Sequence, residues 1–348
     1  MTVWKSHGQR HRGFGVGAGA ALLMTAVAIS AAQAPATSAA KKNASATAAS
    51  VRDASAGATA MPMHRPEKGQ ELFVSPQRAV QALEDALKAD NRAALLKVLG
   101  PSSEKVLWSG DAAEDRASME RFVKKYAEMH RLQMEPDGFT RLYVGAENWP
   151  YPIPLARAGL TWFFDTTAGR EEILDRRVGQ NELTVIQVCA EMAAAEKEYF
   201  SKPHDGEAAG AYAQRILSSA GKENGLYWPG KNGNADSPLG PFIAKAEAEG
   251  YDRGVTRQPE PFHGYFYRVL RGQGPNAKGG AKSYIVNGRM TGGFGFLAYP
   301  AEYRSSGVMT FMVGTDGVVY QKDLGPKTAE LAKSLRVYNP GAGWQPAE

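Results

Sequence analysis

The sequence is poor in the residues that carry covalent or metal chemistry. Cys189 is the only cysteine among 348 residues, so no internal disulfide can form and the fold must be stabilised by packing. In the stretch "LTVIQVCAEM", Cys189 shares an apolar stripe with Val185 and Met192. We therefore interpret Cys189 as a buried, unreactive thiol and not as a nucleophile, which would need a nearby base.

Histidines and the common catalytic motifs are also scarce. None of the six histidines lies in an HExxH pair and no Gly-x-Ser-x-Gly elbow is present, which argues against a zinc hydrolase and a serine hydrolase. The stretch "GPNAKGGAK" (274–282) lacks the Lys followed by Ser or Thr of a phosphate-binding loop, so we interpret it as a turn between strands. We predict no catalytic, cofactor-binding or metal-binding residue and no cofactor.

Calcium loops have weak support in the sequence. The loops "HDGE" (204–207), "NGNADS" (232–237) and "GTDG" (314–317) carry oxygen-bearing side chains, but none has the spacing of a calcium loop that ends in a bidentate Glu. The turn preferences of Asp, Asn and Gly explain these loops equally well. Turns are favoured, and calcium binding stays open.

The body of the chain lacks an excess of charge. The formal charge of +5 comes entirely from the first 60 residues, so the chain from Met61 onward is neutral. This removes the main electrostatic argument for a nucleic-acid partner. We expect no nucleic acid among the partners.

The chain has one long uncharged run, from Gly13 to Ala34, and it is only weakly apolar because Ala and Gly dominate it. Three cations precede it, Lys5, Arg10 and Arg12. This is the layout of a secretory signal, with cleavage near Ala32 to Ala34, and an uncleaved membrane anchor is the alternative. The run has no cysteine for a lipid anchor and no adjacent arginine pair before it. We expect a periplasmic or secreted protein, in contact with a membrane only if the signal is retained.

Composition and pattern divide the rest of the chain. Residues 35–60 are Ala, Ser and Thr with almost no large apolar side chain, which predicts a disordered linker. Residues 61–180 are expected to form a domain of helices and antiparallel sheet, and residues 181–348 a second domain of a long helix and antiparallel sheet. The fold class predicted is α+β.

In the first domain, helices are expected before strands. Ser75-Pro76 predicts a helix start, Asp90 is expected to cap a second helix that Gly100 ends, and a third helical pattern covers 115–131. Strands are predicted at 139–146, 160–167 and 170–178. This order of elements resembles the nuclear-transport-factor-like outline, in which helices cover a curved sheet and leave a pocket.

In the second domain, Asn181 is expected to cap a helix from Glu182 to about Phe200, and a short helix is predicted at 212–217. Ser237-Pro238 predicts a helix that runs through Glu249. Five strands follow, and the last two are expected to turn tightly at Asp316-Gly317. That turn pairs Val313 with Tyr320, and the long helix is expected to pack on the more apolar face of the resulting hairpin.

The order "AEMAAAEKEYF", "AYAQRI", "GYFYRVL" and "AYPAEYRSSGVMTFMVGTDGVVY" is similar to the heads of type IV pilins and type II pseudopilins. That resemblance implies a helix packed on a sheet. This sequence departs from those families because its long helix is internal and capped, with no prepilin leader continuous with it. Only the head-like fold is carried over, and filament assembly is an alternative without support from that helix.

A more specific resemblance covers nearly the whole body. The stretches "YAQRILSSAGKENGLYWPG", "SPLGPFIAKAEAEGY", "HGYFYRVLRGQGPNAKGGAKSYIVNGRMTGGFGFLAYPAEY" and "DGVVYQKDLGPKT" resemble DUF2950, an uncharacterised family of exported bacterial proteins. No activity comes with this resemblance.

Aromatic residues in proline-stiffened loops and on one strand are the candidate contacts for a ligand or partner. They are Trp149, Tyr151, Trp162, Tyr227 and Trp228. Such side chains bury much area at low entropic cost, and the alternative is that they belong to the core. We expect a cell-envelope binding or scaffold protein whose partner is another envelope protein. The alternatives are a periplasmic enzyme with a pocket in the N-terminal half and a pseudopilin-like assembly component.

Overall fold

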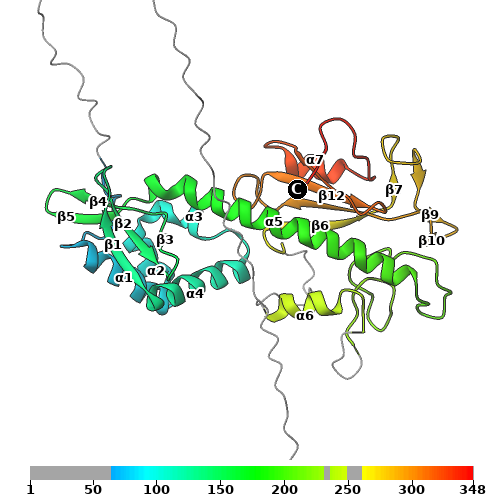
Figure 1. The fold of residues 1–348 in the computed structure, drawn as a ribbon, viewed down its shortest axis with the longest axis horizontal. Helices are drawn as coiled ribbons and strands as arrows, with labels where there is room; N and C mark the ends of the chain where they lie inside the picture. Colours follow the sequence, from blue (N-terminus) through cyan, green and yellow to red (C-terminus); the bar gives the residue numbers. More distant parts are fainter. Residues whose placement is uncertain (1–63, 231–235, 249–260, 348) are drawn as a thin grey trace, which may run out of the picture. The chain divides into compact units, whose positions relative to one another are not determined.

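The computed structural model describes residues 64–230, 236–248 and 261–347 (Figure 1). The predicted signal, at residues 1–34, and the predicted linker, at 35–60, lie outside the described residues. So do most of the loop "NGNADS" and Glu249, the expected end of a helix. Within the described residues, no helix has the length and apolar character needed to cross a membrane.

The helices of the N-terminal half begin where capping side chains stand. Ser75 Oγ accepts a hydrogen bond from Arg78 N (3.3 Å) and starts α1, which confirms the predicted start. Asn91, and not Asp90, caps α2, because Asp90 adopts a positive φ of 46° and lies outside the helix. Gly100 ends α2 as predicted. The bounds are α1 Pro76–Lys88, α2 Arg92–Leu99, η1 Pro101–Ser103, α3 Glu104–Leu107 and α4 Ala112–Glu128.

A five-stranded antiparallel sheet follows, in the order β1-β2-β4-β5 with β3 against β2. The strands are β1 His130–Met134, β2 Thr140–Val144, β3 Trp149–Pro150, β4 Leu155–Ala158 and β5 Thr161–Phe164. The expected helix to residue 131 ends earlier, at Glu128, because His130 already pairs with Val144. One core cluster joins α1, α2 and this sheet, and it includes Leu83, Leu142 and Phe164.

The longest helix, α5 (Thr166–Phe200), overturns two predictions. Residues 170–178 are helical and not a strand, and Asp165 caps the helix through a hydrogen bond from Ala168 N to its Oδ1 (3.0 Å). Asn181 is an interior helix residue that is 4% exposed, and its Nδ2 donates to Ser306 O (2.8 Å). The predicted domain boundary between residues 180 and 181 therefore falls inside α5, and the division into two domains stays a prediction.

The C-terminal half contains a second five-stranded antiparallel sheet in the order β14-β13-β12-β11-β6 (Figure 1). Its strands are β6 Tyr265–Leu270, β11 Gly295–Pro300, β12 Met309–Gly314, β13 Val319–Asp323 and β14 Gln345–Pro346. The end of α5 packs on this sheet as predicted, and Val185, Cys189, Phe296 and Phe311 share one buried cluster. Helix α7 (Thr328–Ser334) contacts β11. The fold class is α+β, as the sequence predicted.

The last hairpin differs from the prediction in its register. Val313 pairs with Val319 and not with Tyr320, so the turn has an odd number of residues and its hydrogen bond runs from Gly317 N to Gly314 O (2.9 Å). A shift of one residue exchanges the two faces of β13. The face of β12 that was expected to be more polar is also buried, with Thr310 and Met312 both at 0% exposure.

Several shorter elements complete the C-terminal half. They are α6 Gly240–Ala248, β7 Gly272–Gln273, β8 Lys282–Ser283, β9 Ile285–Val286 and β10 Arg289–Met290. The stretch 274–282 is largely the turn between β7 and β8, as interpreted from the sequence. The helix predicted at 212–217 is wrong, because Tyr212 bridges to Met290 and Leu217 bridges to Tyr227 in extended conformations.

Candidate functional site

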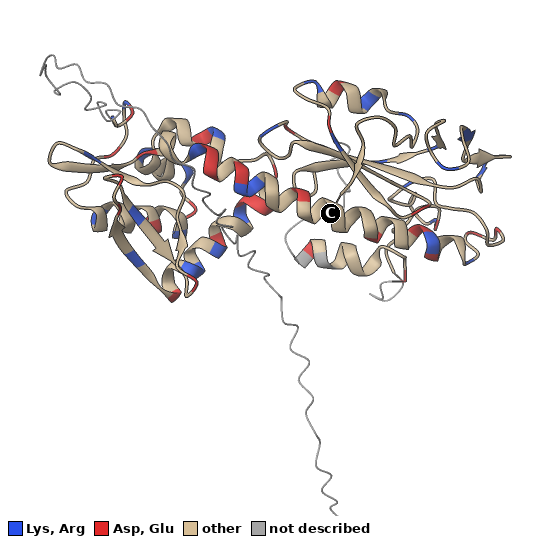
Figure 2. Ribbon diagram, turned by 45° about the horizontal axis from the view of Figure 1, so that its top comes forward, with Lys and Arg blue, Asp and Glu red and all other residues tan. Residues whose placement is uncertain are grey.

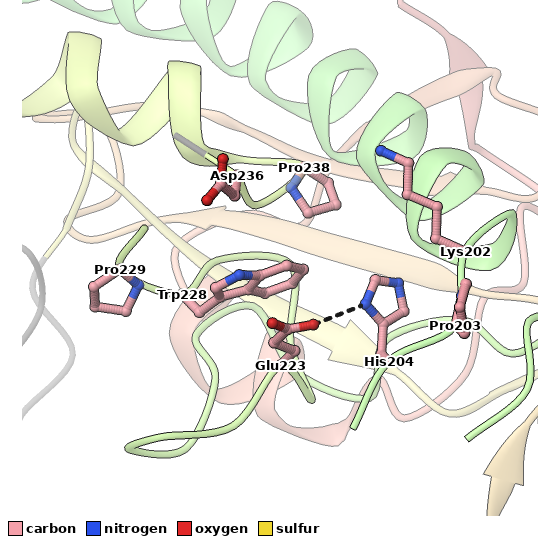
Figure 3. A pocket seen from close by; sticks show the side chains of 8 residues that line it. All are labelled: Lys202, Pro203, His204, Glu223, Trp228, Pro229, Asp236 and Pro238. Atoms are coloured by element: carbon pink, nitrogen blue, oxygen red, sulfur yellow. Dashed lines mark ion pairs between the residues drawn. The ribbon is translucent and has the colours of Figure 1, made fainter. Parts of the chain in front are cut away.

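A pocket of about 300 Å³ lies beyond the C-terminal end of α5 (Figure 3). Its lining combines one indole ring, one imidazole ring, three prolines and charged side chains. The lining residues are Lys202, Pro203, His204, Glu223, Trp228, Pro229, Asp236 and Pro238. The pocket is therefore built from the turn after α5 and the loops that precede α6.

The turn after α5 positions His204. Asp205 has a positive φ of 50° and Gly206 one of 80°, and the backbones of His204 and Glu207 exchange two hydrogen bonds (3.2 and 2.9 Å). The Asp205 carboxylate accepts from Glu223 N with both oxygens (3.0 Å each), which ties the next loop to this turn. The "HDGE" stretch thus behaves as a turn, which the sequence favoured over a calcium loop.

Three aromatic rings pack together at the pocket. The rings of Tyr199 and His204 stack with centroids 3.8 Å apart and an interplanar angle of 13°. Trp228 meets His204 edge to face at 5.5 Å and Tyr199 at 6.4 Å. Since each ring limits the rotamers of the others, the Trp228 indole is held as a firm wall of the pocket.

The polar atoms of His204 are distinguished by their partners. Nε2 lies 3.0 Å from Tyr199 O, and this carbonyl can only accept, so Nε2 carries the hydrogen. In the neutral ring Nδ1 is then an acceptor, and no hydrogen-bond donor for it is found among the described residues although the side chain is only 9% exposed. The nearest charge is Glu223 Oε2, at 3.6 Å from Nδ1 (Figure 3). A buried acceptor without a donor costs free energy, which a ligand donor would recover.

The electrostatics around the pocket are acidic. The Lys202 ammonium pairs with Glu198 Oε1 (2.6 Å), so its charge is already neutralised. Glu223 has only His204 as a charge partner, and no ion pair of Asp236 is found within the described residues. Burial, together with the carboxylates of Asp205 and its acidic neighbours, raises the pKa of Tyr199 to about 12. The site therefore favours positive charge and hydrogen-bond donors.

The described residues around the pocket do not form a set of side chains that could bind a metal ion. Within the described ranges, no group of three or more His, Cys, Asp or Glu side chains is arranged to hold a metal ion. Cys189 is fully buried, and burial raises the pKa of its thiol to about 12, which fits the prediction of an unreactive cysteine.

Of the five aromatic residues predicted as contacts, only Trp228 lines this pocket. Tyr227, its neighbour in sequence, packs against the C-terminal core cluster, and its backbone N donates to Ile216 O (2.9 Å). Trp228 packs against the same cluster and in addition lines the pocket, so only one member of this aromatic pair reaches it.

The other three lie in the N-terminal half. Trp149 is 38% exposed, and the Arg176 guanidinium covers its ring at 4.5 Å. Tyr151 packs between Phe122 (5.1 Å) and Phe164 (6.1 Å) at the rim of the core, and burial raises the pKa of its hydroxyl. Trp162 lies on β5, where its backbone pairs with Phe73. None of these three lines the pocket beside Trp228.

Sequence reasoning missed His204 and Glu223. The sequence singled out His204 only as part of the loop "HDGE", and no motif pointed to Glu223. The residues that surround them are far apart in sequence, and only the turn at Asp205 brings them together. The dipeptide Tyr227-Trp228 before Pro229 was the one available signal.

The comparisons place the chain in a family. The family model described as protein of unknown function (DUF2950) matches residues 70–347. The chain belongs to this family. The match includes the whole pocket, so the pocket is part of the DUF2950 region. No curated protein matches the chain, and no solved structure matches it. The resemblance to pilin heads therefore stays a prediction.

Proposed function

We propose that this chain is an exported binding protein of the cell envelope whose pocket beside Trp228 takes a small organic cation. The observation that carries the ligand class is the carboxylate of Glu223, which is 42% exposed, lines the pocket together with Trp228 and has no Lys or Arg partner among the described residues. An ammonium group can donate to this carboxylate. Its charge is also attracted to an aromatic face.

The acidic side chains around the pocket support a cation over a neutral polyol. Glu223 is 42% exposed in its side chain, and Asp236 lines the same pocket from the loop before α6 (Figure 3). Neither carboxylate is neutralised by a Lys or Arg of the described residues. A neutral polyol would gain hydrogen bonds here but no charge complementarity.

The envelope location rests on the signal-like first 34 residues. A binding role fits a protein that meets its ligand outside the cytoplasm and passes it to, or senses it for, another envelope protein. Fractionation of the native host's cells with an antibody against the chain tests this location, and recovery in the cytoplasm alone would reject it.

The enzyme alternative predicted a pocket in the N-terminal half, and a cavity near Trp149 and Trp162 with His130 or an acid of shifted pKa would favour it. In the structure the His130 ring stacks on Tyr126 at 3.9 Å, and its Nδ1 lies 3.0 Å from Tyr126 O. No observation within the described residues favours that alternative, and none favours an assembly role.

Ligand class is tested with a matched pair of compounds, 1,5-diaminopentane and 1,5-pentanediol, which differ in charge and not in length. We expect the diamine to raise the melting temperature of the full chain and the diol to leave it unchanged. A ligand at one hundred times its dissociation constant stabilises the native state by about 2.7 kcal/mol. Glu223→Gln and Asp236→Asn are expected to reduce the shift, because each removes one negative charge.

The matched control is Glu171→Gln, an exposed carboxylate on α5 outside the pocket. It should leave the shift unchanged. Equal shifts with the diamine and the diol, or equal loss in the control and the pocket variants, would refute the cation assignment.

A further inference from the structure

A second cavity, which we call the arginine groove, follows the edge of the C-terminal sheet and has a volume of about 580 Å³. The cavity is lined by five consecutive residues, the last four of β6 and the one that follows the strand, and by three residues from other segments. They are Tyr267, Arg268, Val269, Leu270 and Arg271, with Gln214, Ile216 and Arg336. Successive side chains of a strand point to opposite faces, so a cavity lined by all five runs along the edge of the strand and not over one face.

Among the described residues β6 pairs only with the strand β11, so it is the terminal strand of the sheet that the structure describes. Gly264 O accepts from Ala301 N (2.9 Å), which places the backbone groups of even-numbered residues toward β11 and those of odd-numbered residues outward. The outward groups of Tyr265 are bonded to Phe262, and Arg271 O accepts from Tyr284 N. Val269 lies between them, and its outward N–H and C=O have no backbone partner in the described part of the chain.

Three arginines give the groove its charge. No carboxylate of the described residues forms an ion pair with Arg268, Arg271 or Arg336. Arg268 donates to Ala332 O (2.6 Å) and Leu335 O at the end of α7. Burial lowers the pKa of its guanidinium, and the positive charge of Arg336 acts in the same direction to a smaller extent. Arg271 and Arg336 are exposed. Neighbouring cations without an acid repel each other, and an anionic occupant would relieve that repulsion.

We propose that the arginine groove binds an extended acidic peptide segment of a partner protein, which adds a strand beside β6. The peptide backbone pairs with the outward N–H and C=O of Val269, and its carboxylates meet Arg271 and Arg336. Addition of a strand to an exposed sheet edge is a recurrent mode of peptide recognition.

The combination of groove and edge favours a peptide over a small anion. A small anion would use the arginines alone, whereas the cavity extends along five residues of the strand. It also runs past the apolar side chains of Ile216 and Val269, which suit alternate residues of an extended chain. This surface shares no lining residue with the pocket beside Trp228, so the inference goes beyond the proposed function and does not depend on it.

The test measures fluorescence anisotropy of the full chain with a labelled octapeptide of alternating Glu and Val. A Lys-Val peptide of the same length and a Glu-Val peptide methylated on alternate backbone nitrogens serve as probes. We expect the Glu-Val peptide to bind and the Lys-Val peptide not to bind. We expect the methylated peptide to bind about tenfold more weakly, because it cannot donate to the strand.

Two exposed arginines are changed to test the charge. The double variant Arg271→Glu, Arg336→Glu is expected to weaken Glu-Val binding at least about tenfold. Arg116→Glu, an exposed arginine on α4, is the matched control and should leave binding unchanged. Equal binding of the methylated and unmethylated peptides, together with full competition by inorganic phosphate, would show a small-anion site and overturn the proposal. Absence of Glu-Val binding at physiological salt would also overturn it.

Discussion

The most unusual single residue is Glu196, a carboxyl group at 0% exposure on the face of α5 that packs into the C-terminal core. Its Oε2 accepts from Ala213 N (2.8 Å), and its Oε1 has no hydrogen-bond partner in the described residues. Burial raises the pKa of Glu196 well above the ordinary value of 4.5, and the single backbone hydrogen bond only partly opposes this. Burial therefore favours the neutral form of this carboxyl group in the folded protein.

This shift predicts how stability depends on pH. Because the folded-state pKa of Glu196 is raised, its protonation contributes to the free energy of unfolding in full below about pH 4.5, the ordinary pKa of the group. This contribution is lost as the pH rises from there through the folded-state pKa. Glu196→Gln keeps an acceptor for Ala213 N and removes the titration. We expect the free energy of unfolding of the wild type, relative to this variant, to fall by roughly 1 kcal/mol per pH unit in that range.

The measurement is urea unfolding of both proteins between pH 4 and pH 8. The control is Glu191→Gln, an exposed residue on the same helix, which should not change the slope with pH. A constant difference between wild type and Glu196→Gln across the range would contradict the prediction.

At the scale of single residues, the sequence predicted burial within one helix better than contacts between distant residues. The buried thiol of Cys189 followed from its apolar stripe, because neighbours on one helix face are set by local spacing. The pocket residues could not be found in this way. His204 becomes part of a site only when Trp228, in another loop, closes over it, and such contacts depend on the whole fold.

At the scale of elements, α5 carries two glycines with opposite environments. A Cβ at Gly179 would meet nothing within 4 Å, whereas a Cβ at Gly169 would meet Pro152 O at 2.6 Å and Ile153 Cα at 2.7 Å. Helix α5 therefore passes the loop before β4 at backbone contact distance, and only glycine permits this at Gly169.

The two positions predict opposite effects of one substitution. Gly179→Ala should stabilise the protein by about 0.5–1 kcal/mol, because alanine reduces the entropy that the helix loses on folding. Gly169→Ala should destabilise it by roughly 1–3 kcal/mol, because backbone atoms must shift to admit the methyl group. Thermal unfolding of the two variants side by side measures both effects, and each serves as the control for the other. Equal changes of one sign would show that the close approach at Gly169 is absent.

The predicted element boundaries were wrong where a local sequence pattern suggested one structure and contacts with residues distant in the sequence imposed another. The stretch 170–178 was assigned to a strand, yet it continues α5, with Ile173 packed against the N-terminal core and Arg176 over Trp149. Charged residues gather in this first half of α5 (Figure 2), and they blur its periodicity. Asn181 resembles a helix cap in sequence, but its amide holds Ser306 O, 125 residues away. The starts of α1 and the α+β class were predictable because caps and element order are local.

At the scale of the whole molecule, α5 contributes to both hydrophobic cores. Ile173 packs against the N-terminal cluster and Val185 belongs to the C-terminal one. With 35 residues at about 1.5 Å each, the helix is about 50 Å long. A continuous helix shared by two cores should couple their unfolding.

That coupling predicts the effect of a break in the helix. Gln180→Pro, at an exposed position between the two cores, removes a helical hydrogen bond and costs about 3 kcal/mol or more. We expect one thermal transition in the wild type and two in this variant, followed by near-ultraviolet circular dichroism and tryptophan fluorescence. Gln180→Ala, which preserves the helix, should retain one transition. A single unchanged transition in Gln180→Pro would mean that the continuity of α5 is not what couples the unfolding of the two cores.

The sharing of α5 also sets an order in time. All residues of the N-terminal cluster come at or before Ile173 in the sequence. The C-terminal cluster is complete only when Tyr338, close to the end of the chain, is present. A chain that emerges N-terminus first therefore completes its first core while Val185, Cys189 and Met192 still face water. During that interval the single thiol, which is inaccessible in the finished fold, is open to alkylation. The rate at which Cys189 becomes protected from alkylation therefore reports how fast the C-terminal core is completed by the last strands.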